Sequence, residues 1–225
     1  MTTTRIALIH ATPLAIDPIK AATARHWPQA QCQHLLDESL SQDLVREGRL
    51  TDAMVQRFVT LARYCQDAGA QGILFTCSAF GPAIEAAGKA TGLPTLKPNE
   101  AMFEQALACK PGGAVLRVGL VATFEASIPS MTEEFMALAR TRGVNAEVIG
   151  CFVPEAMQDL ANGHAQQHHD QVTRAVAQLP ACDVILLAQF SMAAAQPQAQ
   201  GVTSTPVLSS PDCAILALRQ QLNHV

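Results

Sequence analysis

Three strand-like blocks recur in this chain at one constant offset in residue number. The matching pairs are residues 5–9 with 117–121, 73–77 with 185–189, and 94–96 with 206–208. Any two βαβ units share apolar strands, so a chance likeness of pattern can explain a single pair. The three pairs agree on one offset, and Lys110-Pro111-Gly112-Gly113 interrupts the pattern near the midpoint. We therefore predict a duplicated fold with two similar halves.

Strand-like and helix-like stretches alternate within each half. Asp17-Pro18 is a cap residue followed by a proline suited to a first helical turn, and Thr51 is placed to cap a long amphipathic helix that ends near Gly69. Strands that alternate with helices predict a parallel sheet covered on both faces. The expected fold class is α/β, with a first lobe over residues 1–110 and a second over residues 111–225.

Residues 72–81 carry the clearest chemical signal. Their apolar run changes within four residues to a thiol, a hydroxyl and a glycine, which is typical of a buried strand that ends at an opening before a helix. The N–H groups at a helix start favour a thiolate, so we expect Cys77 to have a depressed pKa and to be the most reactive of the seven thiols. The alternative is that Cys77 is a small apolar core residue, as free cysteines often are.

Other polar residues are expected at the same sheet edges, because ligands of open α/β sheets bind beyond the carboxyl ends of the strands. The first strands of the two halves end at His10 and just before Thr123, and the third strands end just before Cys77 and Gln189. We expect the two halves to face each other about an approximate two-fold axis, with residues 77 and 189 on opposite sides of one cleft. His10 is either a second proton donor or a histidine that satisfies backbone groups at a strand end.

This arrangement resembles the aspartate/glutamate/hydantoin racemase superfamily, which includes arylmalonate decarboxylase and maleate isomerase. The resemblance rests on the Thr76-Cys77-Ser78 turn after a buried strand, on the strand over residues 117–123, and on residues 183–192, which follow the first motif by the offset of the repeat. It implies two pseudo-symmetric flavodoxin-like lobes with an active-site cleft between them. It also implies cofactor-independent proton transfer at the carbon next to a carboxylate, with cysteines on both sides of the substrate.

Carried over by position, the resemblance makes Cys77 the acid/base of the first lobe and places the second cysteine at residue 189, where this chain has Gln189. An amide cannot take or give the proton, but it can donate hydrogen bonds to a carboxylate or an enediolate. The expected catalytic residues are Cys77, Gln189 and His10. The expected substrate-binding residues are Thr76, Ser78, Ala79, Thr123, Phe190 and Ser191.

We therefore expect a racemase-like isomerase, independent of pyridoxal phosphate, that acts on a small amino-acid-like or related acid. One alternative is a single-cysteine lyase or isomerase of the arylmalonate decarboxylase or maleate isomerase type. An alternative of another class is a non-catalytic protein that binds small carboxylates, because Gln189 removes half of an acid/base pair. Four apolar side chains suggest a substrate bulkier than aspartate: Phe80, Phe124, Phe190 and Met192.

The composition of the chain argues against two classes of partner, nucleic acids and membranes. A net charge of -4 and 4% aromatic residues argue against a nucleic-acid partner. No apolar run approaches the roughly 18 residues of a membrane span, and the start lacks the features of a signal peptide, so we expect no membrane partner and a cytoplasmic location. A homodimer is the default expectation for the oligomeric state.

Cofactors and metals have little support in the sequence. No GxGxxG motif is present, and even the closest pair of cysteines, Cys65 and Cys77, is too widely spaced for a CxxC site. His164 and His168 are four residues apart, the spacing of two metal ligands on one helix face. No third ligand can be predicted beside them. We expect a solvated helix face there, no metal and no cofactor.

Overall fold

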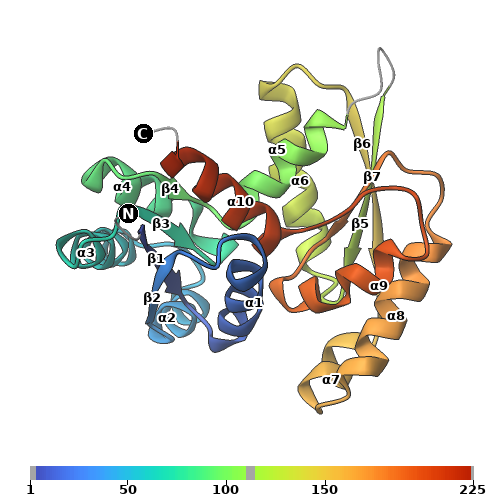
Figure 1. Ribbon diagram of the computed structural model, residues 1–225, viewed down its shortest axis with the longest axis horizontal. Helices are drawn as coiled ribbons and strands as arrows, with labels where there is room; N and C mark the ends of the chain where they lie inside the picture. Colours follow the sequence, from blue (N-terminus) through green and yellow to red (C-terminus); the bar gives the residue numbers. More distant parts are fainter. Residues whose placement is uncertain (1–3, 110–114, 224–225) are drawn as a thin grey trace. The chain divides into compact units, whose positions relative to one another are not determined.

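The computed structural model describes residues 4–109 and 115–223, which contain two four-stranded parallel sheets with flanking helices (Figure 1). The chain divides into two compact units. The first unit is Met1–Ala101 with Ala214–Val225, and the second unit is Met102–Cys213. The expected break at Lys110-Pro111-Gly112-Gly113 lies outside the described residues, and the predicted boundary between residues 110 and 111 stays a prediction.

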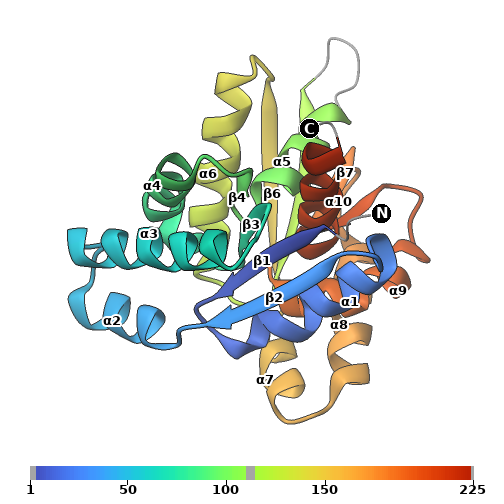
Figure 2. The same cartoon turned by 60° about the vertical axis from the view of Figure 1, so that its left-hand side comes forward.

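In the first unit the strand order is β2-β1-β3-β4, with every pair parallel. Helices α3 and α4 lie side by side (Figures 1 and 2). The elements are β1 (Arg5–His10), α1 (Ile16–His26), β2 (Gln31–Leu36), α2 (Ser39–Glu47), α3 (Asp52–Asp67), β3 (Gly72–Phe75), α4 (Gly81–Thr91) and β4 (Thr95–Leu96), with short 3-10 turns η1 (Pro13–Ala15) and η2 (Ser78–Phe80).

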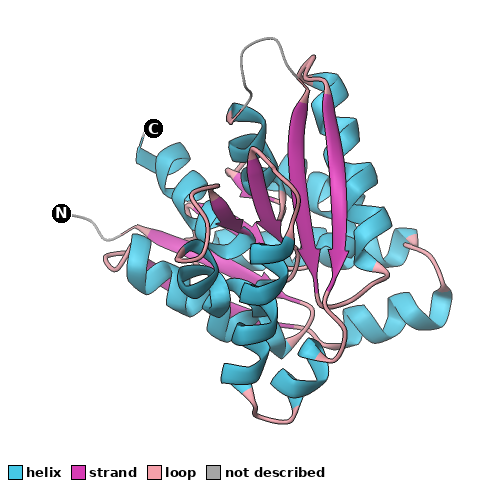
Figure 3. Cartoon of the chain, turned by 90° about the vertical axis from the view of Figure 1, so that its right-hand side faces the viewer, coloured by secondary structure: helices cyan, strands magenta, loops and turns pink. Residues whose placement is uncertain are grey.

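In the second unit the strand order is β6-β5-β7-β8, again parallel throughout. The long strands of this unit point the same way in Figure 3. The elements are α5 (Glu100–Ala108), β5 (Leu116–Ala122), α6 (Ser127–Thr141), β6 (Ala146–Phe152), α7 (Ala156–Ala161), α8 (Ala165–Gln178), β7 (Val184–Leu187), η3 (Phe190–Ala195), α9 (Gln196–Gln200), β8 (Val207–Ser209) and α10 (Ser210–Asn223). Two of these helices cross the boundary between the units: α5 begins in the first unit, and α10 ends in the first unit.

The strand registers confirm the predicted repeat and the predicted α/β fold class. Ile6 pairs with Gly72 in the first sheet, and Val118 pairs with Val184 in the second, so both partners are shifted by the same offset that the sequence predicted. The second strand of each sheet departs from this offset, because Leu8 pairs with His34 whereas Leu120 pairs with Gly150. The additional shift is accounted for by α6, which has 15 residues where α1 has 11.

Local sequence accounts for the elements that support the first sheet. The Thr51 hydroxyl accepts a hydrogen bond from the Met54 N–H at 3.3 Å, so it caps α3 as predicted. One face of α3 then buries Phe58 against Phe75 and Phe80. These aromatic contacts fix the loop after β3, which carries Cys77, against an apolar core.

The equivalent core of the second unit is aliphatic. Strands β5 and β7 bury Val121 and Leu187 against Met192 of η3 and Val172 of α8. Within the described residues, no helix has both the length and the apolar character that a bilayer span needs.

Candidate active site

In the first unit, the carboxyl ends of β1 and β3 bring three predicted residues together. The Thr76 N–H donates to the Ile9 carbonyl at 3.0 Å, which holds Thr76 beside the end of β1, where His10 is the last strand residue. A small, mostly apolar recess lies at this edge, and it is too narrow to hold a water molecule. We call it the Cys77 recess, and it is lined by Ile9, His10, Ala11, Leu40, Phe58, Phe75 and Cys77.

His10 is 0% exposed, and both of its ring nitrogens have side-chain partners. Its Nδ1 lies 2.9 Å from Thr76 Oγ1, and its Nε2 lies 3.0 Å from Nδ1 of His34 on β2. The two imidazole rings stack with centroids 5.2 Å apart. Burial, with smaller contributions from His34 and Lys20, lowers the pKa of His10 to about 4, so the ring is neutral at neutral pH.

The Cys77 thiol is partly buried and precedes η2, as the sequence predicted. Its predicted depressed pKa is wrong. Burial raises the pKa of the thiol, and a hydrogen bond from the Ala79 backbone N–H offsets this only in part. The physical reason is that one N–H of a three-residue turn stabilises the thiolate less than the apolar surroundings destabilise it. The resting group is therefore a thiol that can donate a proton.

In the second unit, Gln189 occupies the place after β7 that Cys77 has after β3. Its Oε1 accepts hydrogen bonds from the Thr123 N–H at 2.8 Å and from the Thr123 hydroxyl at 3.2 Å. Its Nε2 donates to Ser127 Oγ at 2.7 Å, and the Ser127 hydroxyl donates to the Phe124 carbonyl. The amide is thus held in one orientation, with its oxygen toward Thr123 and its nitrogen toward Ser127.

The remaining predicted residues differ in exposure. Thr76 and Thr123 are buried, Ser191 is half-buried, and Ser78 and Ala79 lie nearer the surface in the first turn after Cys77. Of the predicted apolar flank, Phe80 and Met192 are fully buried, Phe190 is buried at the start of η3, and Phe124 is 50% exposed. Phe80 and Met192 are therefore core residues that cannot line a substrate site, whereas Phe124 is exposed.

Sequence reasoning missed His34 as a member of these clusters, and it named Ser127 only as one of two possible contributors after the first strand of the second half. His34 follows Gln31, Cys32 and Gln33 on a strand whose sequence has no strong apolar signal, so its side-chain direction could not be assigned. Ser127 opens α6, and only the fold shows that it faces Gln189. That Cys77 and Gln189 face one cleft stays a prediction.

The histidines of the second unit differ from expectation. His168 is 0% exposed, so the predicted solvated helix face is wrong for this residue, and neither ring nitrogen has a hydrogen-bond partner. Asp159 lies 3.6 Å from Nδ1 of His164 and accepts a hydrogen bond from Gln171. In the part of the chain that the structure describes, no group of three or more His, Cys, Asp or Glu side chains is arranged to hold a metal ion.

Comparisons with known proteins agree with this architecture. Residues 11–218 match the family described as Asp/Glu/Hydantoin racemase. No match was found among the curated proteins.

Several solved structures are similar. An aspartate racemase homologue from Pyrococcus horikoshii has a TM-score of 0.73 at 15% identity, over 99% of this chain and 100% of that one. Allantoin racemase from Klebsiella pneumoniae has a TM-score of 0.69 at 14% identity, over 98% and 88%. A glycine-to-cysteine mutant of arylmalonate decarboxylase, in its sulfate-associated form, has a TM-score of 0.63 at 21% identity, over 97% and 93%. At these identities the likeness establishes the fold.

Proposed function

Since the chain belongs to the Asp/Glu/hydantoin racemase family and is therefore an enzyme of the isomerase type, we propose that its Cys77 thiol transfers a proton at the carbon next to the carboxylate of a small amino-acid-like or related acid. The proposed reaction needs no cofactor. The observation that carries the proposal is the placement of Cys77, as a protonated thiol, directly after the carboxyl end of β3. Ligands of parallel α/β sheets bind at this edge.

The ionisation of Cys77 favours one direction of proton transfer. Because burial raises the pKa of the thiol, Cys77 begins the cycle with its proton and can give it to a carbanion or an enediolate. The thiolate that remains accepts the hydrogen bond of the Ala79 N–H. Removal of a proton from the substrate requires the thiolate first, which the apolar recess disfavours.

Gln189 supports the same reaction in another way. Its amide cannot exchange the proton, but a fixed N–H donor can stabilise the charge that develops on a carboxylate or an enediolate. We propose that Gln189 and Ser78 bind the substrate while Cys77 acts on it, and that Thr123 supports this by holding the Gln189 amide oxygen. This assignment also favours the second candidate, a single-cysteine lyase or isomerase, because inversion normally needs an acid/base on each face of the carbon.

The test is turnover of a panel drawn from the similar proteins: aspartate, glutamate, allantoin and an arylmalonate, followed by NMR in deuterated buffer. Cys77→Ala should lower the rate by roughly a hundred- to ten-thousand-fold, the usual contribution of a general acid or base. Cys109→Ala is the matched control, because that thiol is also partly buried but lies just after α5 and belongs to neither cluster. Its rate should be unchanged.

Two outcomes contradict the proposal. Full turnover by Cys77→Ala removes the thiol from the chemistry. Binding of panel members that protects Cys77 from alkylation, without any turnover or deuterium exchange, leaves the non-catalytic carboxylate-binding protein as the function.

A further inference from the structure

A groove of about 390 Å³ lies in the first unit between helix α4 and strand β4. Strand β4 comes last in the order of its sheet, so none of the described strands pairs with its outer edge, and α4 packs beside it (Figures 1 and 2). The volume is that of a small-molecule site, roughly 300–1,000 Å³. We call this the α4–β4 groove, and it is lined by Ile84, Glu85, Gly88, Lys89, Leu93, Thr95, Lys97 and Glu100.

The backbone of Thr95 presents a hydrogen-bond donor and an acceptor at the outer edge of β4. The Ile73 N–H donates to the Pro94 carbonyl at 2.8 Å, and Ile73 pairs with Thr95. In a parallel ladder of this register, the N–H and the carbonyl of Thr95 both point away from β3. In the described part of the chain neither group has a hydrogen-bond partner. Unpaired backbone groups at a sheet edge can bind an added partner.

The second unit binds the equivalent backbone groups with its own side chains. Val207 of β8 has the register position of Thr95, shifted by the offset of the repeat. The Val207 N–H donates to Gln200 Oε1 at 2.8 Å, and Gln196 Nε2 donates to the Val207 carbonyl at 2.9 Å. An amide oxygen therefore binds the N–H, and an amide nitrogen binds the carbonyl.

The first unit has no side chain that can bind these groups in the same way. Gly88 stands at the position of Gln200, and a Cβ atom added to it would lie 3.2 Å from the Cβ of Thr95. Ile84 stands at the position of Gln196, and it is 1% exposed within the apolar core. The groove is therefore open where the second unit is filled.

Charged side chains of both signs surround the groove. Lys97 donates to Glu85 at 2.5 Å. This hydrogen bond and the charge of Lys97 hold the pKa of Glu85 below its usual value against the effect of burial, and Lys89 adds to the shift. Lys89 is exposed, Glu100 is half-buried, and among the described residues neither makes a hydrogen bond or an ion pair. Two ammonium groups and two carboxylates suit a ligand that carries both charges.

We propose that the α4–β4 groove binds a small aliphatic amino acid as its zwitterion. The ligand carboxylate accepts a hydrogen bond from the Thr95 N–H and faces Lys89. The ligand ammonium group donates to the Thr95 carbonyl and faces Glu100. Leu93, beside the buried Ile84, gives an apolar wall for the ligand side chain. Cys77 does not line this groove, so the site is separate from the proposed chemistry.

Amide hydrogen exchange, followed by NMR of the full chain, tests the backbone contact with leucine as the probe. In the free protein the Thr95 N–H should exchange quickly and the Val207 N–H slowly, because Gln200 protects only the second. Saturating leucine should shift the Thr95 amide signal and slow its exchange roughly tenfold or more. The Val207 amide is the internal control and should not change.

Two truncated probes test the need for both charges. Isocaproate is leucine without its ammonium group, and isoamylamine is leucine without its carboxylate. Each should bind roughly tenfold more weakly than leucine, because it loses one charge-assisted hydrogen bond.

Variants of the protein test the same charges from the other side. Lys89→Gln and Glu100→Gln should each weaken leucine binding by about three- to tenfold. Arg63→Gln on α3 and Glu133→Gln on α6 are the matched controls, because both side chains are exposed and lie outside the groove. Leucine should bind these two variants as it binds the wild-type protein.

Three outcomes overturn the proposal. The first is a Thr95 amide that does not respond to millimolar leucine. The second is binding of isocaproate or isoamylamine as tight as that of leucine, which would mean that a single charge is recognised. The third is that Lys89→Gln and Glu100→Gln bind leucine like their controls.

Cys77→Ala separates this site from the proposed active site. Leucine should still shift the Thr95 amide signal in this variant. Loss of the shift would place leucine at the thiol, so the inference would fail while the proposed function stands. Full turnover by Cys77→Ala would overturn the proposed function instead, and the Thr95 measurement would be unaffected.

Discussion

Buried titratable side chains in this protein are held in their neutral forms. His10 has its hydrogen bonds satisfied by Thr76 and His34, whereas His168 is buried with both ring nitrogens unpaired. Burial, with a smaller effect of His169, lowers the pKa of His168 to about 4, and Asp159 opposes this shift. A polar group that is buried without a partner costs folding free energy. Burial of His168 should therefore destabilise the folded protein, whereas the two hydrogen bonds of His10 offset the cost of its burial.

His168→Leu should therefore stabilise the protein. At pH 7 the free energy of unfolding should rise by about 1–3 kcal/mol, because an unsatisfied polar ring is replaced by an apolar side chain. The unfolded histidine has a pKa near 6.5 and the folded one about 4, so the unfolded state binds the proton first as the pH falls. Wild-type stability should decline between these two values, and the variant should lose less.

Urea unfolding at pH 7 and pH 5 measures both effects. His164→Leu is the control, because His164 is exposed and replacing it should change little. A destabilised His168→Leu variant would mean that the ring has a partner in solution.

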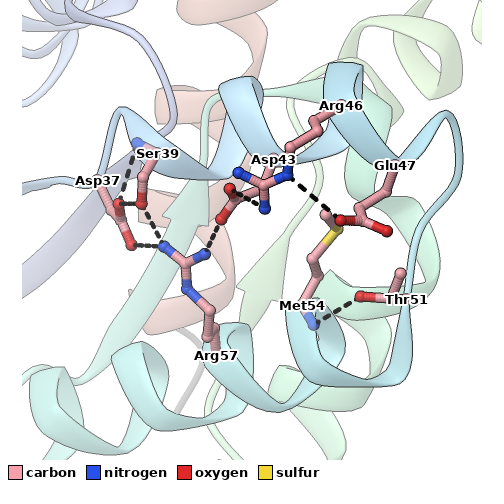
Figure 4. A network of polar contacts seen from close by, with 8 residues as sticks. All are labelled: Asp37, Ser39, Asp43, Arg46, Glu47, Thr51, Met54 and Arg57. Carbon is pink, nitrogen blue, oxygen red and sulfur yellow. Dashed lines mark hydrogen bonds and ion pairs between the residues drawn. The ribbon is translucent and has the colours of Figure 1, made fainter.

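At the scale of elements, one arginine joins two helices of the first unit to the loop after β2. Arg57 of α3 donates to Asp37 Oδ2 and Ser39 Oγ, each at 2.6 Å, and to Asp43 Oδ2 at 2.5 Å (Figure 4). Burial opposes ionisation of Asp37, but hydrogen bonds from Ser39 and Arg57 hold its pKa below the usual range. The Asp37 N–H donates to the His10 carbonyl, so the network also fixes the backbone beside the histidine pair.

Arg57→Ala should lower the free energy of unfolding by about 1–2 kcal/mol, since it removes hydrogen bonds between charged groups that are partly screened by solvent. Arg57→Lys should recover only part of this loss, because one ammonium group cannot reproduce the planar guanidinium fork. Arg46, which is paired with Asp43 and Glu47 on the surface in the same view, is the matched control. Arg46→Ala should cost less than about 0.5 kcal/mol in the same urea titration. Equal losses for the two alanine variants would contradict the network's role.

At the scale of the whole molecule, the sequence was sufficient to predict the repeat and the α/β fold class. Buried parallel strands are continuous apolar runs, and in this chain they recur at a fixed spacing. It did not predict the extra shift of β6, which depends on the length of α6. The pKa of Cys77 and the burial of His168 depend on which side chains pack around them, and that is set by tertiary contacts. His34 could be assigned to the cluster around His10 only from the pairing of β2 with β1.

The duplication leads to the last prediction, because residue 189 stands where the repeat would place a second thiol. Gln189→Cys should raise inversion relative to deuterium exchange on the substrate that the panel identifies, since a second acid/base is restored at the position equivalent to Cys77. The Thr123 N–H and hydroxyl, which now bind the amide oxygen, would be released and could stabilise the new thiolate.

Inversion and exchange are followed together by chiral chromatography and NMR in deuterated buffer. Gln189→Ser is the matched control, because it frees the same Thr123 donors without adding a group that titrates near neutral pH. If Gln189→Cys inverts no better than the parent while His10→Ala abolishes inversion, then the second proton comes from His10. In that case His10 is itself the second acid/base, and Cys77 does not act alone.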